Sequence, residues 1–422
     1  MKFKIVTLGC KVNTYESNVI RDILINNDYI ESDDNSADIY IVNTCTVTNT
    51  SDNKSLKEIR RIRRDNPDSI IVVCGCMLQV KKDIEDIDAN IIIGNTNKSK
   101  IVELLNEYYK DKKKIIKIDN IMNSDFEPMK LNNFNRTRAF VKIEDGCENF
   151  CSYCIIPYAR GKVRSKLPED VLDEVNLLVK GGHKEIVLTG IHTGHYGADL
   201  KDYTFAKLLS ELVKIDGLER IRISSIEMNE LNDDVLDVLR NSDKIVSHIH
   251  IPIQSGSDTI LKLMNRKYLK KDFIDKINEI RDIRPDINIT TDIIVGFPGE
   301  TEELFNETLD TVDKIRFTKI HVFPFSLRKG TKAEELPNHI DEVTKKRRVK
   351  ILISKSEELE KEYMSKYINK EVIFIPEVYR DGYLIGHTGN YLLVKYKGDE
   401  KLLHCDVKVK GVKVEYPYLI CE

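Results

Sequence analysis

Short apolar runs alternate with amphipathic segments along most of the chain. In the first part, helical segments separate these runs, and residues 16–25 and the basic residues 54–64 are the clearest of them. Strand, helix and strand repeated in this order predict a small parallel α/β domain. The apolar runs cover residues 3–8, 38–42, 70–73 and 90–93.

A second series of six apolar runs begins after a polar stretch rich in Lys and Asn. Six βα units of this size predict a parallel barrel that stops short of the full eight strands. The runs cover residues 139–143, 186–188, 221–226, 248–253, 287–295 and 320–325. The helical segments between them cover residues 168–179, 205–215, 235–239, 273–283 and 301–315.

The end of the chain has a different pattern. A charged helix over residues 341–367 leads into short strand-like runs joined by turns that contain Gly, which is typical of a small β-barrel. The fold class is therefore α/β with a β tail. The predicted domains are an N-terminal domain (1–112), a linker (113–136), a partial barrel (137–366) and the tail (367–422).

Composition narrows the class of protein. Of the 422 residues, 41% are hydrophobic and 32% are charged, which is typical of a soluble folded protein. The net charge of −3 means that an RNA partner would have to bind local basic patches. The N-terminus lacks the features of a signal peptide, and no apolar run reaches the roughly 18–20 residues that span a bilayer. We therefore expect a cytoplasmic protein with no membrane partner.

The nine cysteines point to metal chemistry, because a reducing cytosol keeps thiols free. The strongest motif is a C-x3-C-x2-C loop, Cys147, Cys151 and Cys154, directly after the first barrel strand. Three thiolates can hold three irons of a four-iron cluster and leave the fourth iron open. A zinc knuckle is the alternative, but it needs four ligands and no His lies in the loop. The loop resembles the cluster motif of radical S-adenosylmethionine (SAM) enzymes, in which the open iron binds SAM and the reduced cluster cleaves it to a 5′-deoxyadenosyl radical.

Polar and small residues follow the other barrel strands. Loops at the carboxyl ends of parallel strands converge on one face, so we expect these residues to contact SAM. Each is a weak signal alone, because Gly-Pro turns often just end strands, but their joint placement supports the prediction. The expected SAM-binding residues are Tyr153, Thr189, Gly190, Ser225, Glu227, Gln254 and Gly296.

A second set of cysteines is spread over the first part of the chain. Cys10, Cys45 and Cys76 each follow one of the first three predicted strands, and a parallel sheet would gather such positions at one edge. The alternative is that each is a small buried core residue. Cys74 lies two residues before Cys76, so strand alternation would put both on one face, and Cys74 is either a core thiol or a substitute ligand. Cys405 and Cys421 are expected to be packing residues.

Together these motifs resemble the radical SAM methylthiotransferase family over nearly the whole chain. The resemblance implies that Cys10, Cys45 and Cys76 hold an auxiliary [4Fe–4S] cluster, that Cys74 is a bystander, and that the tail is a TRAM-like RNA-binding domain. The matching segments are Thr7-Leu8-Gly9-Cys10-Lys11-Val12-Asn13, Asn43-Thr44-Cys45, Gly75-Cys76-Met77-Leu78-Gln79, Pro157-Tyr158-Ala159-Arg160-Gly161 after the cluster loop, Arg222-Ile223-Ser224-Ser225-Ile226-Glu227, Gly296-Phe297-Pro298-Gly299-Glu300-Thr301 and, for the tail, Gly382-Tyr383-Leu384-Ile385-Gly386-His387-Thr388-Gly389-Asn390-Tyr391.

The family resemblance implies a tRNA-modifying activity with two [4Fe–4S] clusters, in which SAM is both radical source and methyl donor. The segments around Cys10 and Arg160 resemble the branch that methylthiolates carbon 2 of N6-threonylcarbamoyladenosine at position 37 of tRNA. The alternatives are isopentenyladenosine at that position and an aspartate of ribosomal protein S12. The cysteines alone would also fit an iron–sulfur electron carrier or redox sensor, but such a protein does not need the polar strand ends.

Several residues have two open interpretations. Arg160, Lys162 and Arg164 could bind the threonylcarbamoyl carboxylate or be surface charges. The histidines His192, His195, His248 and His250 could line the pocket or pack, and none is assigned to a metal. A reducing partner such as flavodoxin or ferredoxin and a monomeric state are further expectations. The residues expected to contact RNA, or to form solvated faces, are Lys54, Lys57, Arg60, Arg61, Arg63, Arg64, Lys408, Lys410 and Lys413.

Overall fold

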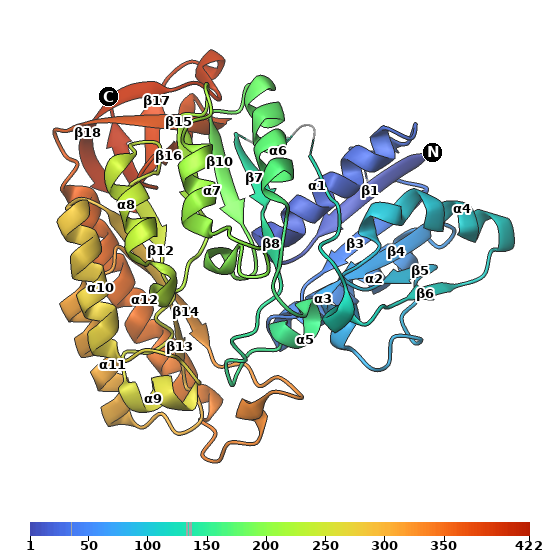
Figure 1. Ribbon diagram of the computed structural model, residues 1–422, viewed down its shortest axis with the longest axis horizontal. Coiled ribbons are helices and arrows are strands. Elements are labelled where there is room, and N and C mark those ends of the chain that lie inside the picture. The colour runs from blue at the N-terminus through green and yellow to red at the C-terminus, as the bar shows by residue number, and fades with distance from the viewer. Residues whose placement is uncertain (35, 132–133, 135–136) are drawn as a thin grey trace.

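The computed structural model describes residues 1–34, 36–131, 134 and 137–422. Its N-terminal part is a six-stranded sheet in the order β2-β1-β3-β4-β5-β6 (Figure 1), and every pair of neighbours is parallel. Apolar clusters cover both faces, which explains why β3 and β4 are apolar without alternation. The strands are β1 (Lys2–Thr7), β2 (Ile30–Glu31), β3 (Ile39–Thr44), β4 (Ile70–Gly75), β5 (Ile91–Ile93) and β6 (Ile115–Lys117).

Helices pack on both faces of this sheet. Side chains of α1 (Lys11–Ile25) and α4 (Ile101–Asp111) join one apolar cluster, and those of α2 (Asn49–Asp65) and α3 (Cys76–Val80) join the other. The short edge strand β2 and the last strand β6 were not predicted. Strand β6 extends the sheet into the segment that we predicted as the linker, of which residues 132–133 and 135–136 lie outside the described part of the chain.

The central part contains the six parallel strands that the sequence predicts, in two three-stranded sheets, β11-β10-β7 and β12-β13-β14. The sheets meet where the Ile226 amide donates to the His250 carbonyl at 3.1 Å. The strands are β7 (Arg138–Lys142), β10 (Glu185–Thr189), β11 (Arg220–Ile223), β12 (His248–His250), β13 (Asn288–Val295) and β14 (Lys319–Pro324), with the pair β8 (Glu144–Asp145) and β9 (Arg164–Ser165) beside them. The helices are α5 (Ile156–Arg160), α6 (Pro168–Lys180), α7 (Phe205–Leu212), α8 (Asp233–Asn241), α9 (Asp258–Leu263), α10 (Lys270–Ile283) and α11 (Glu302–Ile315).

Five strands form a closed barrel in the order β15-β16-β17-β19-β18 at the end of the chain. The structure therefore confirms the predicted α/β class with a small C-terminal β-barrel, and it adds β19, which the sequence analysis missed. The bounds are β15 (Glu371–Arg380), β16 (Tyr383–Thr388), β17 (Leu393–Lys397), β18 (Val407–Glu415) and β19 (Tyr418–Cys421).

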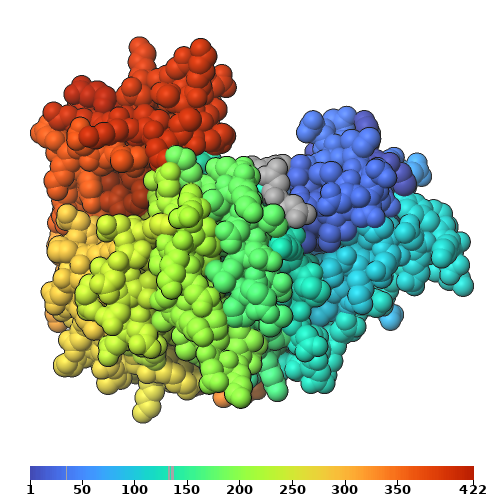
Figure 2. Space-filling view, turned by 45° about the horizontal axis from the view of Figure 1, so that its top comes forward, coloured from blue at the N-terminus to red at the C-terminus, as the bar shows by residue number. Residues whose placement is uncertain are grey.

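Two long helices connect the three parts. Tyr15 and Val19 of α1 belong to the core of the partial barrel, whereas Leu24 of the same helix belongs to the N-terminal sheet. Helix α12 (Glu342–Ser365) packs Leu359 into the partial barrel and Met364 into the C-terminal one. Figure 2 shows the N-terminal residues (blue) and the C-terminal residues (red) at opposite ends of the partial barrel. None of the described helices combines the length and the apolar composition that crossing a membrane requires.

Candidate cluster sites and substrate cavity

Cys10, Cys45 and Cys76 lie at the carboxyl ends of the adjacent strands β1, β3 and β4, as the spacing predicts. Glycines bring them together. Gly9 has φ +108°, and a Cβ there would lie 2.7 Å from the Cβ of Cys45. Gly75 has φ +107°, a conformation that favours glycine, and turns the chain from β4 into α3 at Cys76.

These three thiols influence one another. Burial is the main cause that raises the pKa of Cys45 to about 11, and the neighbouring Cys76 and Cys10 contribute to this rise. A thiolate is therefore unfavourable here unless a cation compensates its charge, and a bound metal deprotonates its thiol ligands. One protein cation is already in place, because Arg160 Nε donates to Cys76 Sγ at 3.1 Å.

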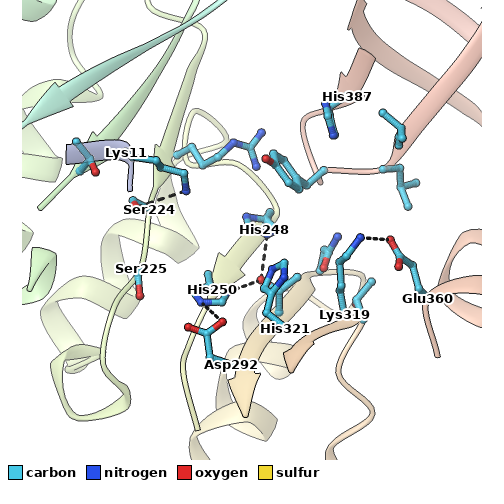
Figure 3. Close-up of a pocket in the computed structure, with 18 of the residues that line it drawn as sticks. Lys11, Ser224, Ser225, His248, His250, Asp292, Lys319, His321, Glu360 and His387 are labelled. Carbon is cyan, nitrogen blue, oxygen red and sulfur yellow. Dashed lines mark hydrogen bonds and ion pairs between the residues drawn. The ribbon is translucent and has the colours of Figure 1, made fainter. Parts of the chain in front are cut away.

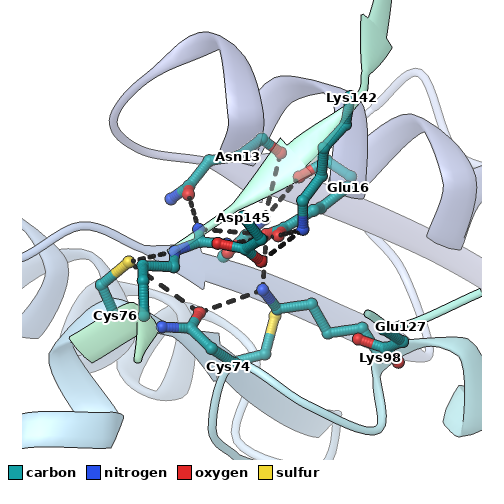
Figure 4. A network of polar contacts seen from close by, with 12 residues as sticks. Asn13, Glu16, Cys74, Cys76, Lys98, Glu127, Lys142 and Asp145 are labelled. Carbon is teal, nitrogen blue, oxygen red and sulfur yellow. Dashed lines mark hydrogen bonds and ion pairs between the residues drawn. The ribbon is translucent and has the colours of Figure 1, made fainter. Parts of the chain in front are cut away.

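Arg160 belongs to a buried network of five ionised side chains that joins the N-terminal sheet to the partial barrel (Figure 4). Its guanidinium lies 2.5 Å from Glu16 Oε1 and 3.2 Å from Asp145 Oδ2. Lys142 pairs with both carboxylates, and Lys98 lies 2.5 Å from Glu16. Burial opposes ionisation of Glu16, but Arg160, Lys142 and Lys98 hold its pKa well below the usual range. Three cations against two carboxylates leave an excess positive charge beside Cys76.

The structure separates Cys74 from this set, and the prediction that Cys74 and Cys76 share a face is wrong. Strand β4 ends at Gly75, so the alternation stops before Cys76 begins α3. Cys74 packs into an apolar cluster with Ile93 and Leu104. It is a core thiol, in line with the bystander role that the family resemblance implied.

The second set of thiols, Cys147, Cys151 and Cys154, lies in the loop after β8. Burial raises the pKa of Cys147, and Cys154 and Cys151 raise it further. Burial also raises the pKa of Cys154 to about 12. Arg266 Nη1 donates to Cys151 Sγ at 3.4 Å, so each set of thiols has one arginine bonded to a sulfur.

Sequence reasoning missed Arg266, because a basic residue between two helices gives no signal in the sequence. Its buried guanidinium pairs with Glu227 and donates to the Tyr268 hydroxyl at 3.0 Å. Glu227, one of the expected SAM contacts, therefore lies near the cluster loop. Together with Cys151 and Glu230, these residues line a small cavity of about 200 Å³.

The spacing of the sulfurs favours a cluster over a single zinc ion. Zn–S bonds of about 2.3 Å in a tetrahedron place sulfurs about 3.8 Å apart. Within the described part of the chain, no group of three His, Cys, Asp or Glu ligand atoms that all lie within 4.8 Å of one another contains a cysteine. His192 Nδ1 does lie 3.8 Å from Cys147 Sγ, which the sequence could not reveal. The donors present thus fit a [4Fe–4S] cluster, which spreads its ligands more widely than one ion does.

A larger cavity of about 710 Å³ joins all three parts of the chain (Figure 3). Cys10 and Lys11 line it from the N-terminal part. The partial barrel contributes the expected SAM contacts Thr189, Gly190 and Ser225. The C-terminal barrel contributes a wall of five residues, His387, Tyr391, Leu392, Leu393 and Pro417.

The electrostatics of this cavity centre on Lys11. Burial, followed by repulsion from Arg222 and Arg138, lowers the pKa of Lys11 to about 8. Burial and the same arginines hold the pKa of His248 well below its usual value, so its imidazole is neutral near pH 7. Of the two interpretations of the histidines, lining the pocket or packing, the first holds for His248 and His250, because both line the cavity.

The remaining expected SAM contacts lie elsewhere around the barrel mouth. Gln254 bridges to Ile293 with φ +68°, and Tyr153 packs against the apolar cluster of Phe297. The Gly296 amide donates to Glu300 Oε2 at 2.6 Å. None of these three is among the residues that line the two cavities, so their contact with SAM stays a prediction.

The three basic residues after the cluster loop, which could be carboxylate ligands or surface charges, occupy different environments. Arg160 is buried in the ionic network, Arg164 donates to the Arg160 carbonyl at 2.6 Å, and Lys162 is exposed. None of the three lines the large cavity. Neither open interpretation fits Arg160, because it is fully buried and its donors are already used inside the protein.

The structure also changes the predictions for Arg63, expected to contact RNA or form a solvated face, and for Cys405, expected to pack. Arg63 of the basic helix uses its guanidinium within its own domain, donating to the Ser69 carbonyl at 2.9 Å and to Asn90 Oδ1 at 2.8 Å. The other basic residues of α2 are exposed, as are Lys408 and Lys410 on one face of β18. Cys421 is buried, but Cys405 is exposed and is not a packing residue.

A parallel sheet, a six-stranded partial barrel and a three-cysteine loop at its mouth define a radical SAM enzyme, which uses SAM and a [4Fe–4S] cluster. Residues 141–312 match the radical SAM superfamily, and residues 2–116 match an uncharacterised protein family, UPF0004. The fold is similar to that of the radical SAM methyltransferase TsrM from Kitasatospora setae, with a TM-score of 0.57, 16% identity, and coverage of 76% of this chain and 72% of that one.

Sequence relatives narrow the class. The chain is 47% identical to the threonylcarbamoyladenosine tRNA methylthiotransferase MtaB of Bacillus subtilis, over 98% of this chain and 94% of the relative. It is 37% identical to the protein of the same name in Aquifex aeolicus, over 94% and 97%. It is 36% identical to the tRNA-2-methylthio-N(6)-dimethylallyladenosine synthase of Acetivibrio thermocellus, over 96% and 88%. The chain belongs to the methylthiotransferase family of radical SAM enzymes.

Proposed function

We infer that this enzyme methylthiolates carbon 2 of N6-threonylcarbamoyladenosine at position 37 of tRNA, and that it holds two [4Fe–4S] clusters. The observation that carries this proposal is the shared cavity. One space of about 710 Å³ is lined by Cys10 from one set of thiols and by Thr189, Gly190 and Ser225 from the barrel. A substrate in it would lie between Cys10 and the expected SAM contacts, while Cys151 of the other set lines the separate small cavity.

The residues divide the work as follows. Cys147, Cys151 and Cys154 would hold a cluster that can supply the electron for SAM cleavage, and Cys10, Cys45 and Cys76 would hold one that can present sulfur. Arg266 and Arg160 each donate a hydrogen bond to a sulfur, at 3.4 and 3.1 Å, which stabilises the thiolate form of the ligands. The C-terminal wall around Tyr391 encloses the substrate base.

The choice of substrate rests on the relatives. Identity is 47% to a relative named for threonylcarbamoyladenosine, and 36–38% to relatives named for dimethylallyladenosine. Mass spectrometry of tRNA nucleosides from cells with and without the gene tests the proposal. We expect 2-methylthio-N6-threonylcarbamoyladenosine to disappear when the gene is deleted. Loss of the isopentenyl product instead would assign the enzyme to the other tRNA branch.

The number of clusters has its own test. Anaerobically reconstituted protein is expected to bind about eight irons per chain, four for each cluster. Cys45→Ala should halve the iron content and keep 5′-deoxyadenosine formation, whereas Cys151→Ala should halve it and abolish that formation. About four irons in the unmutated protein would refute the second cluster. Binding to tRNA through phosphate contacts should also weaken steeply as salt rises.

A further inference from the structure

One wall of the large cavity carries two basic side chains whose N–H groups the described residues satisfy only in part. Arg222 on β11 is 2% exposed and lines the cavity. Its Nε donates to Glu185 Oε1 at 2.8 Å and its Nη2 to the Gly389 carbonyl at 3.0 Å. Its Nη1 is buried and has no hydrogen-bond partner in the described part of the chain. A buried donor in this state is costly, which favours a ligand acceptor at this point.

Lys11 supplies a second cation to the same wall. In Figure 3 its ammonium points to Ser224, and the Nζ–Oγ distance of 3.5 Å is long for a hydrogen bond. No ion pair of Lys11 occurs among the described residues. By contrast, Lys319, the other lysine of the cavity, lies 3.1 Å from Glu360. Lys11 is therefore the lysine of this cavity whose charge is left for a ligand.

Neighbouring side chains hold Arg222 in place. The Tyr391 ring lies 4.7 Å from the Arg222 guanidinium carbon and 4.8 Å from the ring of His248. The Nδ1 of His248 is also buried without a partner among the described residues. The wall thus combines a guanidinium held by its neighbours, an ammonium and a neutral imidazole, and the two cations are donors suited to an oxyanion.

We propose that Lys11 and Arg222 form an oxyanion site that binds the carboxylate of the threonylcarbamoyl group and so distinguishes this substrate from adenosines with a neutral N6 substituent. This inference rests on the proposed function. A backbone phosphate of the RNA is also an oxyanion. However, Lys11 is next to Cys10 in the cavity proposed to receive the base, whereas the phosphates belong to the backbone and not to the base. The carboxylate is therefore the ligand assigned to the site.

The test measures binding of the cluster-reconstituted enzyme to three anticodon stem-loop RNAs. Position 37 carries threonylcarbamoyladenosine, its methyl ester or unmodified adenosine. A charge-assisted hydrogen bond at this site should make Lys11→Met bind the acid about 10- to 100-fold more weakly, with little change for the ester and for adenosine. Lys11→Arg should restore most of the affinity. Lys271→Met removes an exposed lysine on α10 that does not line the cavity, and this variant should bind all three RNAs like the unmutated enzyme.

The outcomes separate the alternatives. Equal weakening for all three RNAs would assign Lys11 to a phosphate and overturn the proposal, as would unchanged binding of the acid. Arg222→Lys, which keeps the charge but loses Nη1, should also lower the preference for acid over ester, and a preference unchanged in both variants refutes the site. Iron content reports whether each variant retains its clusters. If the unmutated enzyme forms no methylthio product from the acid RNA, the proposed function itself fails, independently of these affinities.

Discussion

The buried network around Arg160 offers the sharpest test of how the N-terminal sheet is joined to the partial barrel. The perturbation is Arg160→Met, which keeps much of the side-chain volume but removes the charge. It deletes the contacts with Glu16 Oε1 at 2.5 Å, Asn13 Oδ1 at 2.8 Å and Cys76 Sγ at 3.1 Å. Removing one partner from a buried ion pair typically costs about 3–5 kcal/mol, because the other charge stays buried.

The network sets where in this range the effect should fall. Glu16 keeps two cations, since Lys98 at 2.5 Å and Lys142 at 2.9 Å remain. Asp145 keeps Lys142 at 2.6 Å. We therefore expect a loss near the lower limit, about 3 kcal/mol, which is a large share of a typical stability of about 5–15 kcal/mol. Arg347→Met is the matched control, because Arg347 pairs with Glu302 on the surface and such pairs contribute about 0–1 kcal/mol.

Hydrogen exchange is the suitable assay, because a chain of several parts need not unfold in one step and contains no Trp for fluorescence. The free energy of opening measured by exchange should fall by about 3 kcal/mol for peptides from α1 and α5. It should stay unchanged for peptides from the C-terminal barrel. In a double-mutant cycle with Glu16→Gln, the two changes should couple by about 0.5–3 kcal/mol. A loss below about 1 kcal/mol, or equal acceleration in the C-terminal barrel, would refute the reasoning that the network is the structural junction.

Three further predictions concern the cluster sites and a buried acid. Gly9 has φ +108°, and Gly9→Ala would place a Cβ 2.7 Å from the Cβ of Cys45. The iron bound at the N-terminal site should therefore fall sharply, while the other site keeps about four irons. Full iron content in this variant would contradict the prediction. Cys74→Ala should keep all iron, whereas Cys76→Ala should lose about half, since Cys74 packs within an apolar cluster and Cys76 does not; equal losses would make Cys74 a ligand. Burial raises the pKa of Glu144 well above its usual value, so its contribution to stability is present below about pH 4.3 and is lost as pH rises through the folded-state pKa. Glu144→Gln should therefore gain thermal stability relative to the unmutated apoprotein as pH rises above about 4.3, and a stability difference independent of pH would show that ionisation of Glu144 costs the fold nothing.

The sequence determined most of the architecture. Apolar runs found the long strands β3 and β4 of the N-terminal sheet, because these strands are buried at every position and both of their faces are covered. It missed the short strands β2, β6 and β19, whose two to four residues carry too little pattern to detect. It also brought Cys10, Cys45 and Cys76 to one sheet edge, since parallel strands that follow one another in this way place their carboxyl ends together.

The tertiary structure decided what those residues face. Nothing local in the sequence distinguishes Arg160, which is buried in an ionic network, from Lys162, which is exposed. The Arg160 partner Glu16 is more than a hundred positions away in the sequence, and its partner Asp145 lies on another element. The cavity that joins Lys11, Arg222 and Tyr391 likewise exists only because three separate parts of the chain pack against one another. Spacing along a chain fixes which side of an element a residue occupies, but burial and charge pairing depend on what packs against that side.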